Sequence, residues 1–411
     1  MVIIYWKERM MKRKMRGMIL TNRLRKSFLI PELPVPIKKK THKTKYYEND
    51  ESASIICGVF FLISYKERNM PINQLRRNPI NGRWTIVLMD QLNLSNLTVK
   101  EKKKASGVSS CPFCEGNEKM TPPEIMALRS EGFGMNESGW RIRVIPDKNP
   151  VLQIYGDLNN RGFGMYDVLD GIGAHEIVIE SPKHTETFVD LSEDRITEIF
   201  WTYRERILDL KEDSRFRYVL VHKNYGEAVG PTSEHSYSFI IASPITPKRV
   251  KDELINSRAY YDYKERCLLC DIIRQELTDQ DRVVLEDGKF IALTPFASSR
   301  PFEVWIMPQK HEPFFELTAD LRPLAKMTKE LLVRIHTLLN EPDYIMAIHS
   351  GPNIKAGRRR GYWQSLERDY HWHLEIMPRL RAYTSFEASS GFPINSVPPE
   401  KAAALLREIG A

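Results

Sequence analysis

The pattern of hydrophobic and polar positions runs through the same order twice in this chain. In the first copy an alternating run that ends in a histidine is followed by a helical run and then by two further alternating runs. These segments are 175–184, 192–213, 216–226 and 234–247. The corresponding segments of the second copy are 290–311, 317–340, 344–352 and 370–380. Alternation with a period of two predicts strands and a period near 3.6 predicts helices, so we predict a duplicated α+β unit.

Each copy begins with a C-x-x-C pair and contains two histidines at matching places. The first set is Cys111, Cys114, His184 and His235, and the second set is Cys267, Cys270, His311 and His371. Two thiolates and two imidazoles suit Zn²⁺ in tetrahedral geometry. We therefore predict one structural Cys2His2 zinc site in each half, with no open position for water. The alternative is that one set has lost its metal and that its cysteines only pack.

Charge sets off an extension at 1–69, and the repeat divides the rest of the chain into two halves, which we place at 70–250 and 251–411. Residues 1–69 carry a net charge of +10 and the rest of the chain a net charge of −2, so the basic character belongs to an extension that reads as a flexible tail. This argues against nucleic-acid binding by the two predicted halves.

The extension holds an apolar run, 54–65, of only 12 residues. A membrane-spanning helix needs about 20, so we predict no membrane span and a cytoplasmic protein. Two interpretations of the extension stay open: a transit peptide, or a natural start at Met70.

Eight motifs together resemble the galactose-1-phosphate uridylyltransferases and their relatives, which include nucleotidyl-sugar phosphorylases. They are LRRNPINGRW, CPFCEGNEKMTPPE, WRIRVIPDKNPVL, GIGAHEIVIESPKH, KNYGEAVGPTSEH, TPKRV, PFEVWIMPQKH and HWHLEIMPRL, spread in order from about residue 74 to the C-terminus. The resemblance implies a duplicated histidine-triad fold of antiparallel sheets with packed helices, often as a homodimer. It also implies transfer of a uridylyl group between a nucleotide sugar and a sugar 1-phosphate, through a histidine that attacks the α-phosphate.

The same resemblance assigns roles to individual residues. The family's active-site loop reads H-x-H-x-Q, with a zinc ligand, a nucleophile and a phosphate donor in that order. In this chain the loop is 235–239, so Tyr237 stands at the nucleophile position and Phe239 at the donor position. Substrate-binding roles fall on four further residues, Asn224, Gly226, Asp147 and Lys148.

Two departures bear on activity. The loop lacks its second histidine, and no Arg or Lys occurs between Arg83 and Lys100, where the family usually holds phosphates. A phenol attacks phosphorus only when deprotonated, and an unperturbed tyrosine titrates near pH ~10. His373 in the second copy is an alternative nucleophile, although the matching pair in the family helps to hold a metal. Glu253 falls where some relatives place a metal-binding glutamate.

Three functions remain open at this level. The first is a working nucleotidyltransferase that acts on nucleotide sugars, or a nucleotidyl-sugar phosphorylase. The second is a family member that binds a nucleotide sugar without covalent transfer. The third is an unrelated redox or interaction protein that uses its C-x-x-C pairs; the doubled Cys–Cys–His–His order argues against it, and stoichiometric zinc would exclude it.

Overall fold

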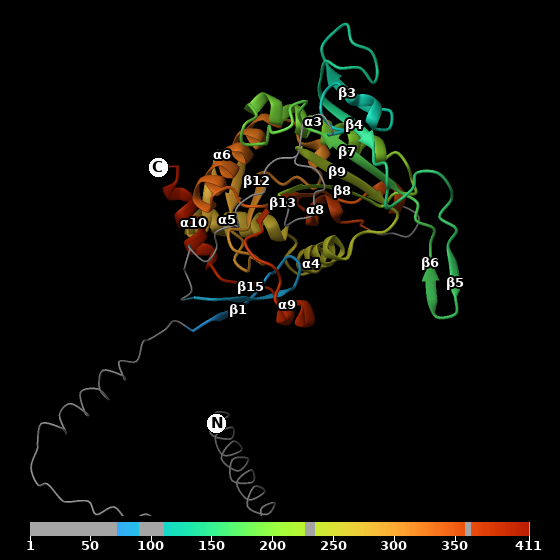
Figure 1. Ribbon diagram of the computed structural model, residues 1–411. Helices are drawn as coiled ribbons and strands as arrows, with labels where there is room; N and C mark the ends of the chain where they lie inside the picture. Colours follow the sequence, from blue (N-terminus) through green and yellow to red (C-terminus); the bar gives the residue numbers. More distant parts are fainter. Residues whose placement is uncertain (1–71, 90–110, 227–234, 358–362, 411) are drawn as a thin grey trace, which may run out of the picture. The chain divides into compact units, whose positions relative to one another are not determined.

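The computed structural model describes residues 72–89, 111–226, 235–357 and 363–410 (Figure 1). The predicted extension, 1–69, lies outside the described residues. Among the described helices, none combines the length and the apolar character needed to cross a bilayer.

One ten-stranded sheet organises the chain, and every pairing within it is antiparallel. In spatial order its strands are β10 (Val283–Glu286), β11 (Phe290–Leu293), β12 (Val304–Pro308), β14 (His373–Pro378), β13 (Tyr344–His349), β8 (Tyr218–Tyr225), β9 (Tyr237–Ser243), β7 (Ala174–Ile179), β4 (Trp140–Pro146) and β3 (Met126–Arg129). The predicted α+β class with a duplicated unit is therefore confirmed, but its two sets of strands form one continuous sheet.

The duplication is visible in the strand order. Counted from the outer edges, β3, β4, β7, β9 and β8 follow one another on one side, and β10, β11, β12, β14 and β13 on the other. The two sets meet where β8 pairs with β13, with Ala347 opposite His222 and Ile345 opposite Asn224. Because side chains alternate across a sheet, these paired residues share one face across the junction.

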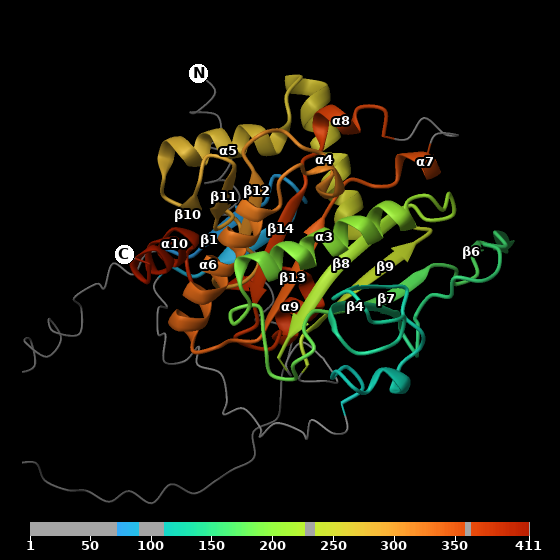
Figure 2. The same ribbon diagram turned by 90° about the horizontal axis from the view of Figure 1, so that it is seen from above.

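Two long helices cover one face of the sheet (Figure 2). They are α3 (Glu193–Leu210) and α6 (Arg322–Leu339), and with α10 (Pro399–Glu408) they contribute to the largest hydrophobic cluster. Ser192 caps α3 by accepting a hydrogen bond from the Arg195 amide. The predicted helical run 317–340 becomes a helix only from residue 322, and Pro323 occupies its first turn, where a missing N–H group costs nothing.

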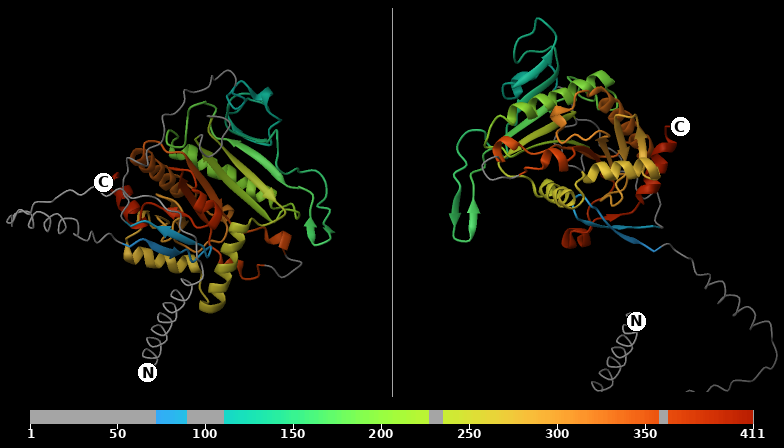
Figure 3. Two further views of the ribbon diagram at one scale, coloured as in Figure 1. Left: turned by 60° about the horizontal axis from the view of Figure 1, so that its bottom comes forward. Right: turned by 180° about the vertical axis from the view of Figure 1, so that it is seen from behind.

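The other face carries shorter elements (Figure 3). Helix α4 (Lys248–Lys264) lies there, since Val250 and Leu254 pack with Tyr218. So does a small sheet of β1 (Gln74–Arg77), β2 (Trp84–Val87) and β15 (Ile394–Asn395). The remaining elements are the hairpin β5 (Arg161–Phe163) and β6 (Tyr166–Val168), α5 (Leu268–Asp279), α7 (Ile354–Gly357), α8 (Leu366–Asp369), α9 (Ser385–Ser390), η4 (Glu118–Met120) and η6 (Phe315–Leu317).

Candidate functional site

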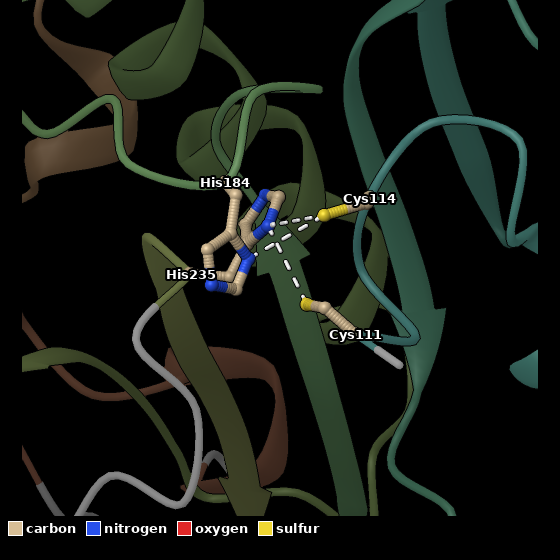
Figure 4. Close-up of side chains that lie close together, drawn as sticks. All are labelled: Cys111, Cys114, His184 and His235. Atoms are coloured by element: carbon tan, nitrogen blue, oxygen red, sulfur yellow. Dashed lines mark hydrogen bonds between the residues drawn. The ribbon is translucent and has the colours of Figure 1, made fainter. Parts of the chain in front are cut away.

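The first Cys–His set converges as the sequence predicted. Cys111, Cys114, His184 and His235 are all buried, and their ligand atoms lie within 4.8 Å of one another (Figure 4). The Sγ atom of Cys114 lies 3.4 Å from Nδ1 of His184 and 3.7 Å from Nδ1 of His235. Tetrahedral bonds of about 2.3 Å to sulfur and 2.0–2.1 Å to nitrogen place S and N about 3.6 Å apart, so this set fits Zn²⁺.

The second set has the same construction. The ligand atoms of Cys267, Cys270, His311 and His371 also lie within 4.8 Å of one another. The Sγ atom of Cys270 lies 3.4 Å from Nδ1 of both His311 and His371. A hydrogen bond from the Cys267 thiol lowers the pKa of the Cys270 thiol to about 3, with further help from the two histidines. Cys267 occupies the N-cap position of α5 without a capping side-chain hydrogen bond, and Cys270 lies in the first turn of the helix.

Backbone carbonyls orient the histidines of both sets. Nε2 of His235 donates to the Ser181 carbonyl at 2.6 Å, and Nε2 of His371 donates to the Pro308 carbonyl at 2.9 Å. The tautomer with hydrogen on Nε2 leaves a lone pair on Nδ1, the atom that faces the thiols. The donor chemistry, the distances and the tautomers thus all fit a structural metal ion at each set.

The candidate nucleotide loop enters the sheet directly after His235. Tyr237 and Phe239 are in β9, opposite Ile179 and Ile177 of β7. Tyr237 is only 5% exposed, and its ring makes edge contacts with Phe113 and Phe239 at 5.3 and 5.2 Å. The nucleophile position implied by the resemblance is therefore part of an aromatic cluster.

Two histidines that the sequence reasoning did not assign to the site flank Phe239. His222 stacks on the Phe239 ring at 5.2 Å, and His175 lies at 5.2 Å from the same ring. Burial, with the neighbouring His175, lowers the pKa of His222 to about 4, so its imidazole is neutral at pH 7. The period-two alternation of β8 and β7 was the signal that could have placed both residues on this face.

The predicted substrate-binding residues take different positions around this loop. Asp147 follows β4, and its carboxylate lies 3.5 Å from Nε2 of His175. Lys148 is exposed. Asn224 is on β8 and lines a cavity on the same sheet face. Gly226 has a φ of 90°, and a Cβ atom there would overlap the Asp343 carboxylate, so glycine is required for steric reasons alone.

A third group of side chains comes together beside the second copy. Glu253, His349, His373 and Glu375 are all buried, with one ligand atom of each within 4.8 Å of the others. Nδ1 of His349 lies 3.0 Å from both carboxylate oxygens of Glu253. Although burial opposes it, Arg249 lowers the pKa of Glu375, and its guanidinium lies 2.5 Å from that carboxylate.

His373, the alternative nucleophile, is at the centre of this third group. Its side chain is fully buried, and the Trp305 ring stacks on it at 4.8 Å. Its Nε2 lies 3.5 Å from the Glu375 carboxylate, and among the described residues its Nδ1 has no hydrogen-bond partner. A buried imidazole between two carboxylates suits cation ligation better than attack on a phosphate, because its ring has no exposed surface.

Comparison with known proteins supports the resemblance to the galactose-1-phosphate uridylyltransferases. Family models match two adjoining regions: the N-terminal domain of galactose-1-phosphate uridyl transferase over residues 148–247, and its C-terminal domain over residues 253–408. The chain is 30% identical over 344 residues to an ADP-glucose phosphorylase from Arabidopsis thaliana, covering 82% of this chain and 93% of that protein. It is 26% identical to a galactose-1-phosphate uridylyltransferase from Thermotoga maritima, covering 82% and 98%.

Solved structures of similar proteins have the same fold. The crystal structure of an ADP-glucose phosphorylase from Arabidopsis thaliana with bound ADP-glucose superposes with a TM-score of 0.67 at 29% identity, covering 82% of this chain and 99% of that one. A uridylyltransferase structure gives a TM-score of 0.62 at 23% identity, which supports the fold. The chain belongs to the galactose-1-phosphate uridyltransferase family.

Proposed function

We propose that this protein acts on nucleotide sugars and sugar 1-phosphates as a nucleotidyltransferase. The observation that carries the proposal is the retained framework of the loop. A Cys2His2 set holds the start of β9 at His235. Asn224 lies on β8, which pairs with β9, and Asp147 follows β4, which is separated from β9 by β7. The similarity to an ADP-glucose phosphorylase and to galactose-1-phosphate uridylyltransferases supports the same class of substrate.

A metal bound by each Cys2His2 set would tie distant strands to a cysteine loop and supply no reactive position. The chemistry therefore falls to the residues of the sheet face. The resemblance places a nucleophile at residue 237, where this chain has a tyrosine. Attack by Tyr237 requires loss of the phenol proton, and the Tyr237 ring is only 5% exposed and packs in an aromatic cluster.

Transfer without a covalent intermediate fits this arrangement better. In such a step an oxygen of the acceptor phosphate attacks the α-phosphorus of the nucleotide sugar. The bond from that phosphorus to the bridging oxygen breaks, and the sugar 1-phosphate leaves with the bonding pair. The acceptor is a sugar 1-phosphate or inorganic phosphate, and catalysis consists of positioning and charge stabilisation.

A second candidate function is binding without turnover. It is favoured by the contacts of Phe239, whose ring is stacked between His175 and His222 where the family's phosphate donor is expected. A phenyl ring donates no hydrogen bond to a phosphoryl oxygen, so its presence removes one source of charge stabilisation.

One experiment separates the two. The protein is incubated with UDP-glucose or ADP-glucose, with and without inorganic phosphate or galactose 1-phosphate, and glucose 1-phosphate release and intact mass are measured. Release that needs an acceptor, without a mass adduct, supports direct transfer. An adduct mapped to Tyr237 or His373 would instead show a covalent route and contradict direct transfer.

Two variants serve as controls. Tyr237→Phe keeps the ring and removes the hydroxyl, so direct transfer predicts an unchanged rate. The double variant Tyr237→His/Phe239→Gln restores the family's loop chemistry. An adduct on this variant alone, with no release by the natural protein, would support binding without turnover.

The expected homodimer stays a prediction, and light scattering on the eluting protein checks it.

A further inference from the structure

His222 stands directly opposite Phe239 in the sheet. The antiparallel register pairs the two residues across β8 and β9, and their rings stack at 5.2 Å with an angle of 28° between the ring planes. Directly opposite residues on adjacent strands have Cβ atoms about 4.5–5.5 Å apart. A hydrogen-bond donor at residue 222 therefore lies one strand away from the position where the resemblance expects a phosphate donor.

The imidazole of His222 is reached from the side away from Phe239. There it is opposite Ala347 of β13, whose methyl group covers little of a ring. A cavity of about 360 Å³ opens over this junction, and His222, Ala347 and Asn224 all line it. Because residues two apart on a strand share a face, His222 and Asn224 point to the same side of β8. The ring is thus covered by Phe239 on one side and open to the cavity on the other.

The two ring nitrogens of His222 have different surroundings. Nδ1 is buried without a hydrogen-bond partner among the described residues, whereas the side chain as a whole is only partly buried. Buried N–H groups without an acceptor are rare, so we assign the ring hydrogen to Nε2. Burial lowers the pKa of His222 to about 4, so the imidazole is neutral at pH 7. In this tautomer the ring is an uncharged donor, and its lone pair is on the buried Nδ1, where it is not available for attack on phosphorus.

We propose that Nε2 of His222 donates a hydrogen bond to a non-bridging phosphoryl oxygen of the nucleotide sugar, in place of the donor that Phe239 does not supply. The proton stays on Nε2 throughout, and the hydrogen bond strengthens as negative charge develops on that oxygen during transfer. Phe239 is then a positioning residue, because its stacked ring fixes the plane of the imidazole. The inference rests on the proposed function for the class of ligand.

Exchange of the two side chains tests the proposal. The measured quantity is release of glucose 1-phosphate from ADP-glucose or UDP-glucose, with inorganic phosphate or galactose 1-phosphate as acceptor. His222→Phe keeps a ring against Phe239 and removes the donor, so kcat should fall about 10²-fold. His222→Phe/Phe239→Gln places an amide donor on the opposite strand and should recover at least about tenfold of this loss. His222→Gln retains a side-chain donor and should lose less than His222→Phe.

His336→Phe is the matched control, because it makes the same exchange on the sheet face that α6 covers. The His336 ring packs against Tyr225 and Tyr344 at 5.5 and 5.9 Å. This variant should keep the kcat of the natural protein. Thermal unfolding shows whether each variant is folded, and His222→Leu against His222→Gln makes the same comparison if His222→Phe unfolds.

Calorimetric titration with ADP-glucose and UDP-glucose separates failure of this inference from failure of the proposed function. A natural protein that binds a nucleotide sugar but releases no glucose 1-phosphate would refute transfer. The donor would then be judged by affinity, which should be about tenfold weaker in His222→Phe and recover in the exchanged double variant. Absence of both binding and release would refute both proposals.

Three results would overturn the donor assignment and leave transfer standing. The first is a kcat and an affinity that are unchanged in His222→Phe. The second is an exchanged double variant that is no better than His222→Phe, because the loss would then come from packing and not from the donor. The third is a mass adduct mapped to His222, which would make this residue a nucleophile.

Discussion

Glu180→Gln should strongly destabilise the protein, because Glu180 neutralises a buried lysine directly beneath the candidate loop. Its carboxylate is fully buried and lies 2.5 Å from Nζ of Lys223, whose side chain is 1% exposed. It also accepts hydrogen bonds from Ser236 and Tyr203 at 2.6 and 2.8 Å, and another from Ser238. Lys223 donates in turn to Ser236 and to the Tyr237 carbonyl.

The magnitude follows from burial. Removing one partner of a buried ion pair leaves an uncompensated charge and costs about 3–5 kcal/mol. We expect Glu180→Gln to lie in this range, measured as the free energy of unfolding in urea. Adding Lys223→Met removes the stranded charge, so the double variant should recover roughly 2 kcal/mol. Lys183→Met changes a lysine that is 74% exposed and should cost less than about 0.5 kcal/mol.

The pH dependence supplies an independent check. Burial lowers the pKa of Lys223 even with Glu180 present, and removing Glu180 takes away the interaction that raises it. At pH values between the folded-state and the unfolded-state pKa of Lys223, the unfolded form of Glu180→Gln binds more protons than its folded form. The free energy of unfolding of this variant therefore increases with pH. The deficit of Glu180→Gln relative to the natural protein should shrink as the pH rises above neutral.

A cost for Glu180→Gln no larger than that of Lys183→Met would refute this reasoning. So would a double variant that is less stable than Glu180→Gln, because the cost would then come from lost hydrogen bonds and not from charge.

Three further outcomes are expected. Metal analysis of the purified chain should find two zinc ions. Cys114→Ser should bind one zinc ion and melt at a lower temperature, whereas the control Cys57→Ser should retain both. The pKa of His222 is about 4 in the folded protein and about 6.5 in the unfolded chain, so this histidine contributes about 3 kcal/mol to stability above pH 6.5 and loses it as the pH falls toward 4. In His222→Phe, the free energy of unfolding in urea should therefore change less with pH over that interval. The Phe315 ring is fully buried, so Phe315→Ala should lower the free energy of unfolding in urea by about 3–5 kcal/mol. Phe133 is 48% exposed, so Phe133→Ala should lower it only slightly.

Much of the candidate site could be predicted from spacing because its ligands recur in order. Cys111 and Cys114 stand in one short loop, His184 ends one alternating run and His235 stands at the head of another, and the second copy repeats this order. Such local signals specify which residues can meet. They carry no information on which ring nitrogen faces the metal; carbonyl groups such as that of Ser181 decide it in the folded chain.

The third group could not be assembled from spacing, although the resemblance already pointed to Glu253 and His373 as candidate metal ligands. Glu253 is on α4, His349 on β13, and His373 and Glu375 on β14, so no short motif contains them all. Only the antiparallel register, which sets His349 opposite His373, and the packing of α4 on the same face bring them together. The same holds for Arg83 and Arg300 around the cavity, which come from the small sheet and the 297–303 segment.

Alternation and ligand spacing are local properties of a chain, so the duplicated α+β unit and the two Cys2His2 sets could be predicted from the sequence without the structure. The tertiary structure decided that both units share one sheet, through the pairing of β8 with β13. It also decided that Tyr237 and Phe239 are packed among other rings, and that Arg83, Arg249 and Arg300 line a cavity over β8 and β13. These are contacts between distant segments, and only the closing of the sheet and the packing of α4 fix them.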